Sequence, residues 1–270
     1  MKLLPLFPAI LLLLRGAHAQ GGETDFATEM TESTFKLFNP VSTATCFLVQ
    51  RHPVEAVLYV VTAAHVLEKA SGDKMVLVLR DPRPDGTYQR HDHDVEIRRD
   101  GKPVWTRHPQ EDVGVLRLAD PLPVPSPALP FSRLADDETI SPKLLHIGSP
   151  VLVLTYPTRF EANEAGFPIA RQGIVASHPV LPPSRHHTFI ADFTTFDGDS
   201  GGPVFVEGSR HHPLVVGIVL AQFRHDETVR LEYEERTIHH PLGLGTVLQA
   251  RFVRETIDLA AKAAVPAKPN

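Results

Sequence analysis

Residues 198–208 read GDSGGPVFVEG, and this stretch decides between two fold classes. A serine among glycines occurs in ordinary tight turns and in turns that present a nucleophile, because glycine supplies positive φ angles. Gly-x-Ser-x-Gly is also the nucleophile turn of α/β hydrolases, in which a helix follows the serine and an acid and a histidine come later, here Asp226 and His239. The residues after Ser200 predict a strand, and no βαβ alternation surrounds them. The stretch therefore favours an all-β protein.

Short β-branched segments separated by turn residues fill most of the chain. They predict strands in TCFLV, AVLYVVTAA, KMVLVL, HDVEIRR and DVGVLRL, and then in PVLVLTY, RQGIVASH, HTFIADF, GPVFVEG, LVVGIVLAQF, RLEYEERT and GTVLQA. A proline-rich connector at 120–142 lies between the two groups. We predict two six-stranded antiparallel β-barrels, over residues 20–130 and 131–264. The second ends in a helix indicated by Phe252, Val253, Ile257, Leu259 and Ala260, and residues 265–270 form a tail.

The N-terminus has the pattern of a secretory signal peptide over residues 1–19. Lys2 precedes an apolar run, and small residues precede a cleavage site expected after Ala19. We therefore expect a secreted or periplasmic protein. No apolar segment reaches the roughly 20 residues of a membrane span, so stable membrane insertion is not expected. The formal net charge of -5 argues against nucleic acid as a partner.

Two segments could supply the groups that a nucleophilic serine needs. A serine hydroxyl is a weak nucleophile, so it requires a base, which in turn is held by a carboxylate. His65 follows the small residues that end one predicted strand, in TAAH, and Asp112 begins another, in DVGVL. A carboxylate buried at a barrel rim needs a polar partner. The candidate catalytic residues are His65, Asp112 and Ser200, in that order along the chain.

At TAAH, DVGVL and GDSGGP the chain resembles the chymotrypsin/trypsin-like serine peptidases, over about Phe47 to Ile257. The segments LVLTYPTRF, PIARQGIVASHP and FIADFTTFDGDSGGPVF look like the disulfide-free bacterial branch and, more distantly, the HtrA/Deg proteases, here without a PDZ module. One cysteine, Cys46, allows no disulfide within the chain, and we expect it to be a buried strand residue. The resemblance implies a serine endopeptidase that works through an acyl-enzyme, with Gly198 and Ser200 as the oxyanion hole.

The resemblance also implies a specificity pocket. Its base would be Thr194, and its walls would come from Leu220, Ala221, Gln222 and Gly243. Because the base carries no aspartate, we expect an uncharged side chain before the scissile bond. Peptide or protein substrates would pair, as an added strand, with the edge of the segment 220–222.

Asp199 binds the freed N-terminus in zymogen-activated relatives, but the sequence contains no matching activation site and assigns this carboxylate no partner.

Two other readings of the sequence remain. Histidine pairs at 91/93, 186/187, 211/212 and 239/240, and the acidic residues Asp81, Asp85, Asp92 and Asp94, could hold a metal. Their spacing favours solvated loops instead, so we expect no metal and no cofactor.

A non-catalytic or latent protease-like binding protein could also use the same scaffold. The sequence leaves the oligomeric state open.

Overall fold

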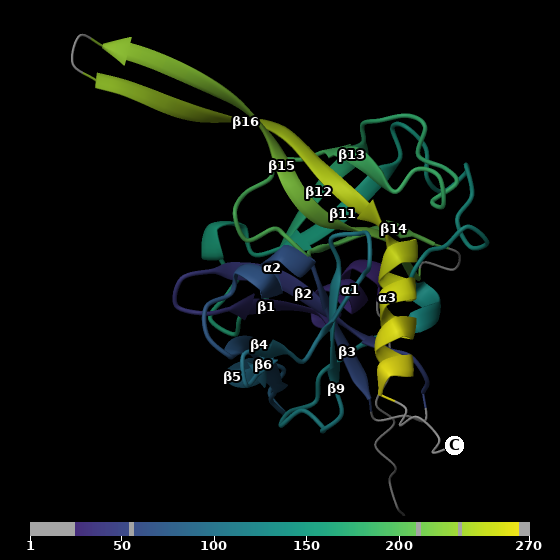
Figure 1. Ribbon diagram of the computed structural model, residues 1–270. Helices are drawn as coiled ribbons and strands as arrows, with labels where there is room; N and C mark the ends of the chain where they lie inside the picture. The colour runs from purple at the N-terminus through teal and green to yellow at the C-terminus, as the bar shows by residue number, and fades with distance from the viewer. Residues whose placement is uncertain (1–24, 54–56, 209–211, 232–233, 265–270) are drawn as a thin grey trace, which may run out of the picture.

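The computed structural model describes residues 25–53, 57–208, 212–231 and 234–264 (Figure 1). The protein is mostly β, as predicted. The signal-peptide residues, the tail at 265–270 and one member of a histidine pair, residue 211, lie outside the described residues. Secretion, the cleavage site and the exact domain boundaries therefore stay predictions.

The first half of the chain forms an eight-stranded sheet. Seven strands follow the order β5-β4-β1-β2-β3-β9-β8, and β10 pairs in parallel with β2. The path of hydrogen-bonded strands does not return on itself, so a closed barrel is not confirmed in this half. The strands are β1 (Thr34–Phe38), β2 (Thr43–Gln50), β3 (Leu58–Thr62), β4 (Lys74–Pro82), β5 (Tyr88–Glu96), β8 (Thr106–Arg107), β9 (Gly114–Leu118) and β10 (Leu129–Pro130), with β6 (Arg98–Arg99) and β7 (Lys102–Pro103) as a separate small ribbon.

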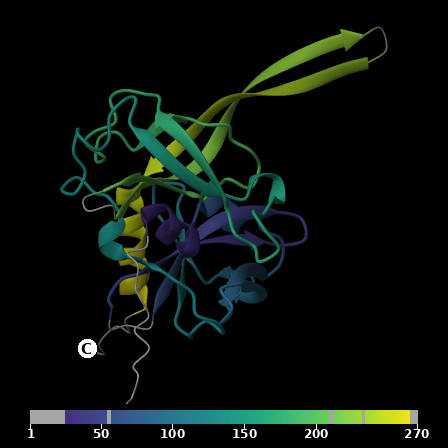
Figure 2. The same cartoon turned by 180° about the vertical axis from the view of Figure 1, so that it is seen from behind.

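The second half forms the predicted closed barrel of six strands. The order around it is β11-β12-β13-β16-β15-β14. Its strands are β11 (Pro150–Thr155), β12 (Ile169–Val175), β13 (Thr188–Asp192), β14 (Pro203–Glu207), β15 (Pro213–Leu231) and β16 (Glu234–Gln249). The last two are much longer than the others, and their outer ends leave the barrel as a projecting ribbon (Figures 1 and 2).

This ribbon corrects one predicted strand. The segment RLEYEERT, residues 230–237, was expected to be a single strand, but Leu231 and Glu234 are paired across two antiparallel strands. The prediction was wrong because periodicity alone does not mark where a chain reverses, so the end of β15 and the start of β16 were merged into one segment.

Helices begin and end the described chain. The predicted C-terminal helix is confirmed as α3 (Ala250–Ala263), which buries Phe252, Val253 and Ile257 and leaves Leu259 exposed. The sequence analysis missed two short helices, α1 (Phe26–Ser33) and α2 (Ala64–Lys69), and two 3-10 turns, η1 (Phe131–Arg133) and η2 (Pro157–Arg159). Helix α1 has a clear N-cap, because the Asp25 carboxylate accepts hydrogen bonds from the backbone N–H groups of Ala27 and Thr28.

The apolar run of β2 reflects burial on both of its faces. Phe47 and Val49 pack into a core shared with the second barrel and α3, whereas Cys46 and Leu48 pack into a core within the first half. Cys46 is fully buried, as expected, and this burial raises the pKa of its thiol. A strand buried on both faces reads as continuous apolar sequence. Strand β2 therefore joins the two halves of the molecule.

Polar contacts also tie the halves together beside β2. The Glu161 carboxylate accepts hydrogen bonds from Lys36 Nζ, at 2.6 Å, and from Arg90 Nη1, at 2.7 Å. Burial disfavours ionisation of Glu161, but these two bonds outweigh it and lower the pKa of the carboxyl group. The ionised form of Glu161 therefore contributes to the docking of the two halves.

We expect Glu161→Gln to lower the free energy of unfolding at neutral pH by about 2 kcal/mol, because two charge-assisted hydrogen bonds are weakened. A lowered folded-state pKa adds stability that is present above the unfolded pKa and is lost as the pH falls through the folded pKa. The stabilities of the wild type and the variant in urea unfolding should therefore converge as the pH falls below about 4.3, the ordinary pKa of glutamate. Glu164→Gln, in the same loop but exposed, is the matched control and should behave as wild type.

Candidate active site

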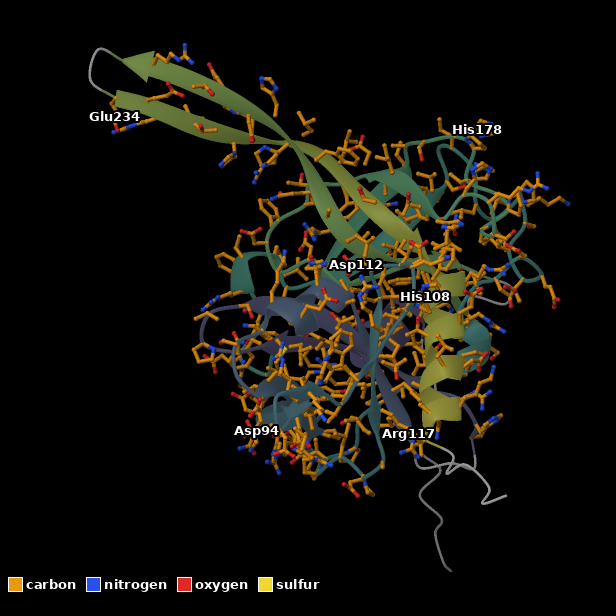
Figure 3. All side chains as sticks on the ribbon, in the orientation of Figure 1. Asp94, His108, Asp112, Arg117, His178 and Glu234 are labelled. Carbon is orange, nitrogen blue, oxygen red and sulfur yellow. The ribbon has the colours of Figure 1, made fainter. Side chains whose placement is uncertain are left out.

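The fold brings the three candidate catalytic residues together from both halves of the chain. His65 lies in the first turn of α2, Asp112 precedes β9, and Ser200 lies in the turn before β14. His65 Nδ1 is 2.6 Å from Asp112 Oδ2, and His65 Nε2 is 3.1 Å from Ser200 Oγ. Figure 3 labels Asp112 near the centre of the view, between the barrel and the eight-stranded sheet. Serine, imidazole and carboxylate thus form one hydrogen-bonded chain.

The Asp112 carboxylate is held in its ionised form. Burial disfavours its charge, but hydrogen bonds from the side chain and the backbone of His65 outweigh this effect and lower the pKa of Asp112. The backbone bond, from His65 N to Asp112 Oδ1, is 2.9 Å long. An ionised carboxylate at Nδ1 favours the tautomer that carries its proton there, which leaves Nε2 as an acceptor facing Ser200.

A second histidine, His108, shapes the loop that carries Asp112. The buried His108 accepts hydrogen bonds at Nδ1 from the backbone N–H groups of Gln110 and Glu111. Its Nε2 lies 3.2 Å from Glu255 Oε2 of α3. The C-terminal helix therefore helps to hold the turn before Asp112. His108 was not among the predicted site residues, although a histidine so close to the candidate aspartate was a possible signal.

The turn around Ser200 tolerates only glycine at its two bends. Gly198 has φ +97°, and a Cβ there would lie 2.3 Å from the Tyr156 carbonyl oxygen. Gly201 has φ +85°, and a Cβ there would lie 2.3 Å from the Thr45 carbonyl oxygen. Both positions need a positive φ and a close approach of backbone to backbone. The glycines of GDSGGP therefore allow the turn to dock against its neighbours.

Thr45 of β2 is the residue on which this turn docks. Its backbone N–H donates to the Ser200 carbonyl at 3.0 Å, and its hydroxyl donates to the Gly198 carbonyl at 2.8 Å. The same hydroxyl accepts from the Tyr156 N–H at 3.1 Å, and Thr62 Oγ1 donates to the Thr45 carbonyl at 2.8 Å. The sequence analysis missed Thr45, and only its polarity inside the apolar run TCFLV set it apart.

The turn has two backbone donors without an acceptor among the described residues, and both belong to residues that line the cleft beside Ser200. Gly198 and Ser200 both line it, and neither of their backbone N–H groups has a hydrogen-bond acceptor within the part of the chain that the structure describes. Ser200 Oγ itself lies 3.1 Å from the Leu220 carbonyl oxygen, a second acceptor for the hydroxyl proton.

Asp199 pairs with Arg171, a residue of β12 that the sequence analysis did not single out. Arg171 Nη2 lies 2.6 Å from Asp199 Oδ2, and this oxygen also accepts from the Phe196 N–H at 2.8 Å. Arg171 Nη1 donates to the Thr194 carbonyl, and the guanidinium lies over the rings of Phe193 and Phe196. Burial raises the pKa of Asp199 despite the arginine beside it. One internal cation therefore holds the segment before Ser200.

The cleft beside Ser200 has a volume of about 480 Å³. Of the residues expected to form the specificity pocket, Leu220, Ala221 and Gln222 line it, whereas Thr194 and Gly243 are not among the lining residues. Thr195, which is buried, takes the place expected for Thr194, whose side chain is exposed. Neighbouring residues of an extended segment point to opposite sides, so a shift of one residue exchanges them. Lys69 and Arg224 also line the cleft.

The described histidines of the predicted pairs contact single carboxylates at most. No group of three or more histidine, cysteine, aspartate or glutamate side chains in the described residues is arranged to hold a metal ion. His187 Nδ1 contacts Glu111 at 2.7 Å, and His239 and His240 each face one carboxylate on the opposite strand.

None of the helices that the structure describes is long and apolar enough to cross a membrane.

The comparison with family models assigns the chain to a family. The family model described as a trypsin-like peptidase domain matches residues 44–218, and the chain belongs to this family. The predicted resemblance is therefore confirmed. No curated protein matches the chain. A solved structure of Rv3671c from M. tuberculosis H37Rv, a serine-to-alanine mutant in its inactive form, is similar with a TM-score of 0.49 and 19% sequence identity, over 90% of this chain and 92% of that chain.

We expect Arg171→Met to lower the free energy of unfolding by about 3–5 kcal/mol, because it leaves the buried Asp199 carboxylate without its cation. The double variant Arg171→Met, Asp199→Asn should recover most of this loss, since no charge remains unpaired. Denaturant unfolding of both single variants and the double variant measures the coupling. A loss in the double variant equal to the sum of the two single losses would contradict the ion pair.

Proposed function

We propose that this protein is a serine endopeptidase that cleaves peptide bonds through an acyl-enzyme. The hydrogen-bonded chain Asp112–His65–Ser200 is the observation that carries this proposal. Ser200 Oγ attacks the scissile carbonyl carbon as His65 Nε2 takes its proton. The imidazolium then donates that proton to the leaving amine, and water repeats the sequence to release the acid. Asp112 keeps the imidazole in the required tautomer and stabilises its charged form.

The glycine turn supplies the second element of this mechanism. The tetrahedral intermediate places a negative charge on the former carbonyl oxygen. The backbone N–H groups of Gly198 and Ser200 border the cleft and are free to donate to this oxygen. Each such donor contributes roughly 3–4 kcal/mol to transition-state stabilisation. Arg171 supports this role indirectly, because it pairs with Asp199 between the two donors.

A latent or non-catalytic protein on the same scaffold is the second candidate. The Leu220 carbonyl competes with His65 for the Ser200 hydroxyl proton, since both lie 3.1 Å from Oγ. A hydroxyl that donates to Leu220 is not activated by the imidazole. The family's double-barrel arrangement, with the eight-stranded sheet in the place of the first barrel, would serve either candidate.

A fluorophosphonate probe separates the two candidates. We expect rapid labelling of the wild type, none of Ser200→Ala, and labelling of Asp112→Asn slower by about 10⁴-fold, because the imidazole then adopts the wrong tautomer. The measurement is the rate of covalent modification by mass spectrometry, with the thermal unfolding midpoint of each variant as the folding control. A folded wild type that does not label would support the latent or non-catalytic protein.

We also propose that the residue before the scissile bond is uncharged. Thr195 and Val219 contribute neutral side chains to the cleft, and the charge of Asp199 is compensated by Arg171. Asp197 is exposed and also lines the neighbouring hollow formed by Ser42 and Thr43, so it lies at the margin of the cleft.

Cleavage of a peptide library should therefore favour uncharged residues before the scissile bond over lysine and arginine, by at least about tenfold in kcat/KM. Asp197→Asn should leave this preference unchanged. A preference for lysine or arginine that Asp197→Asn abolishes would show instead that the marginal carboxylate selects the substrate.

A further inference from the structure

The outer ends of β15 and β16 form a two-stranded arm that projects from the barrel (Figures 1 and 2). We define the arm as residues 224–231 and 234–241, which are paired from Arg224 opposite Pro241 to Leu231 opposite Glu234. A register shift between Gln222 and Arg224 separates it from the barrel. Glu234 lies at its outer end (Figure 3). The arm is therefore a distinct element rather than a part of the barrel wall.

The arm has no cover within the described structure. Strand β14 pairs with β15 only as far as Ile218, and β13 pairs with β16 only from Leu244 onwards, so both outer edges of the arm are unpaired among the described strands. Every side chain from Glu234 to His240 is exposed, including Ile238 at 43%. A lone two-stranded ribbon is at best marginally stable in water, and an open edge is a template for another strand.

Ion pairs across the arm hold its two strands to each other. His239 Nδ1 lies 2.6 Å from Asp226 Oδ1, and Arg230 Nε lies 3.1 Å from Glu235 Oε2. These pairs join side chains within the ribbon and leave its backbone edges open. They explain why the arm keeps its register, and they do not satisfy the exposed strand edges.

The two edges differ in what lies beside them. Going inwards, β15 continues directly into Leu220, Ala221 and Gln222, which line the cleft beside Ser200. A strand added along β15 would run towards the cleft. The free edge of β16 lies on the opposite side of the ribbon, so a strand can pair there and leave the cleft open.

The free segment of β16, EERTIHH from Glu234 to His240, is complementary to itself when it is turned end to end. In antiparallel pairing about Thr237, Glu234 faces His240 and Glu235 faces His239 of the other copy. A two-fold axis repeats both pairs, so four carboxylates face four imidazoles. Opposed acidic and basic side chains stabilise antiparallel strands, and like charges opposite each other destabilise them. Pro241 lacks an N–H group and ends the segment that can pair.

We propose that this arm is a dimerisation element, which pairs through Glu234–His240 of β16 with the same segment of a second copy of this chain. The two arms then form one four-stranded antiparallel sheet with a two-fold axis at Thr237. Such an interface is isologous, so it closes at two copies and leaves no further β16 edge for growth. Ile238 lies opposite the aliphatic part of Arg236 of the other copy, on the same face of the new sheet.

Cysteine cross-linking tests the register directly. Thr237→Cys places two thiols opposite each other at the two-fold axis, where facing Cβ atoms are about 5 Å apart. With a short thiol-reactive cross-linker this variant should give covalent dimers. Thr228→Cys is the matched control, because Thr228 faces Thr237 within the same arm, is also exposed and lies on β15. Equal cross-linking of both variants, or of neither, would overturn the proposal.

Exchanging the charges of the segment Glu234–His240 tests the same interface, with the oligomeric state as the measured quantity. Wild type should be dimeric in sedimentation velocity at micromolar concentration. Two double variants should each be monomeric, because each places like or unmatched charges opposite one another. The first combines Glu234→Lys with Glu235→Lys, and the second combines His239→Glu with His240→Glu. An equimolar mixture should form heterodimers, since every facing pair is then complementary, and this rescue excludes simple unfolding of the arm. A monomeric wild type, or variants that dimerise as wild type does, would refute the arm-to-arm interface.

Discussion

The site depends on the docking of one turn of the second half against one strand of the first. Thr45 bonds the turn around Ser200 from both its backbone and its hydroxyl, and the approach is so close that only glycine fits at Gly198 and Gly201. His65 and Asp112 come from the first half, so the distance from imidazole to serine is set by this contact. Because β2 is buried on both faces, the surface that receives the turn is itself rigid.

Charge is used in two different ways in the molecule. Between segments that dock, the charges are largely buried and paired, as in Arg171 with Asp199 and Lys36 and Arg90 with Glu161. A buried charge is tolerated only with a partner, so these pairs specify how neighbouring segments lie. On the arm the pairs are exposed, and each contributes little to stability in water. On the arm, the pattern of charges determines which strand edge of another copy can pair with it.

The candidate site could be predicted from the sequence because its chemistry is carried by short motifs. His65, Asp112 and Ser200 stand in segments whose residue types are set by local requirements, such as glycine at a positive φ. Residues that support them were not predicted. Thr45 and His108 act through partners that are distant in the chain, namely Gly198, 153 positions from Thr45, and Glu255, 147 positions from His108. Arg171 likewise pairs with Asp199 of another segment, and no local pattern reports such contacts. The exchange of Thr194 for Thr195 in the cleft shows how a shift of one residue escapes sequence reasoning.

The fold, like the site, could be predicted only in part from the sequence. The β-branched runs, the connector and the amphipathic C-terminal segment determined an all-β protein with a final helix, because burial of one face imposes a period on the sequence. Whether a row of strands closes is decided by the pairing of its first and last members, which is why one barrel is confirmed and the other half forms an eight-stranded sheet. The reversal at 231–234 was likewise invisible to periodicity. By itself the sequence determined an all-β fold and pointed to His65, Asp112 and Ser200 as the candidate catalytic residues. Only the tertiary structure decided which residues hold them in place and where the arm leaves the barrel, because both depend on contacts between distant parts of the chain.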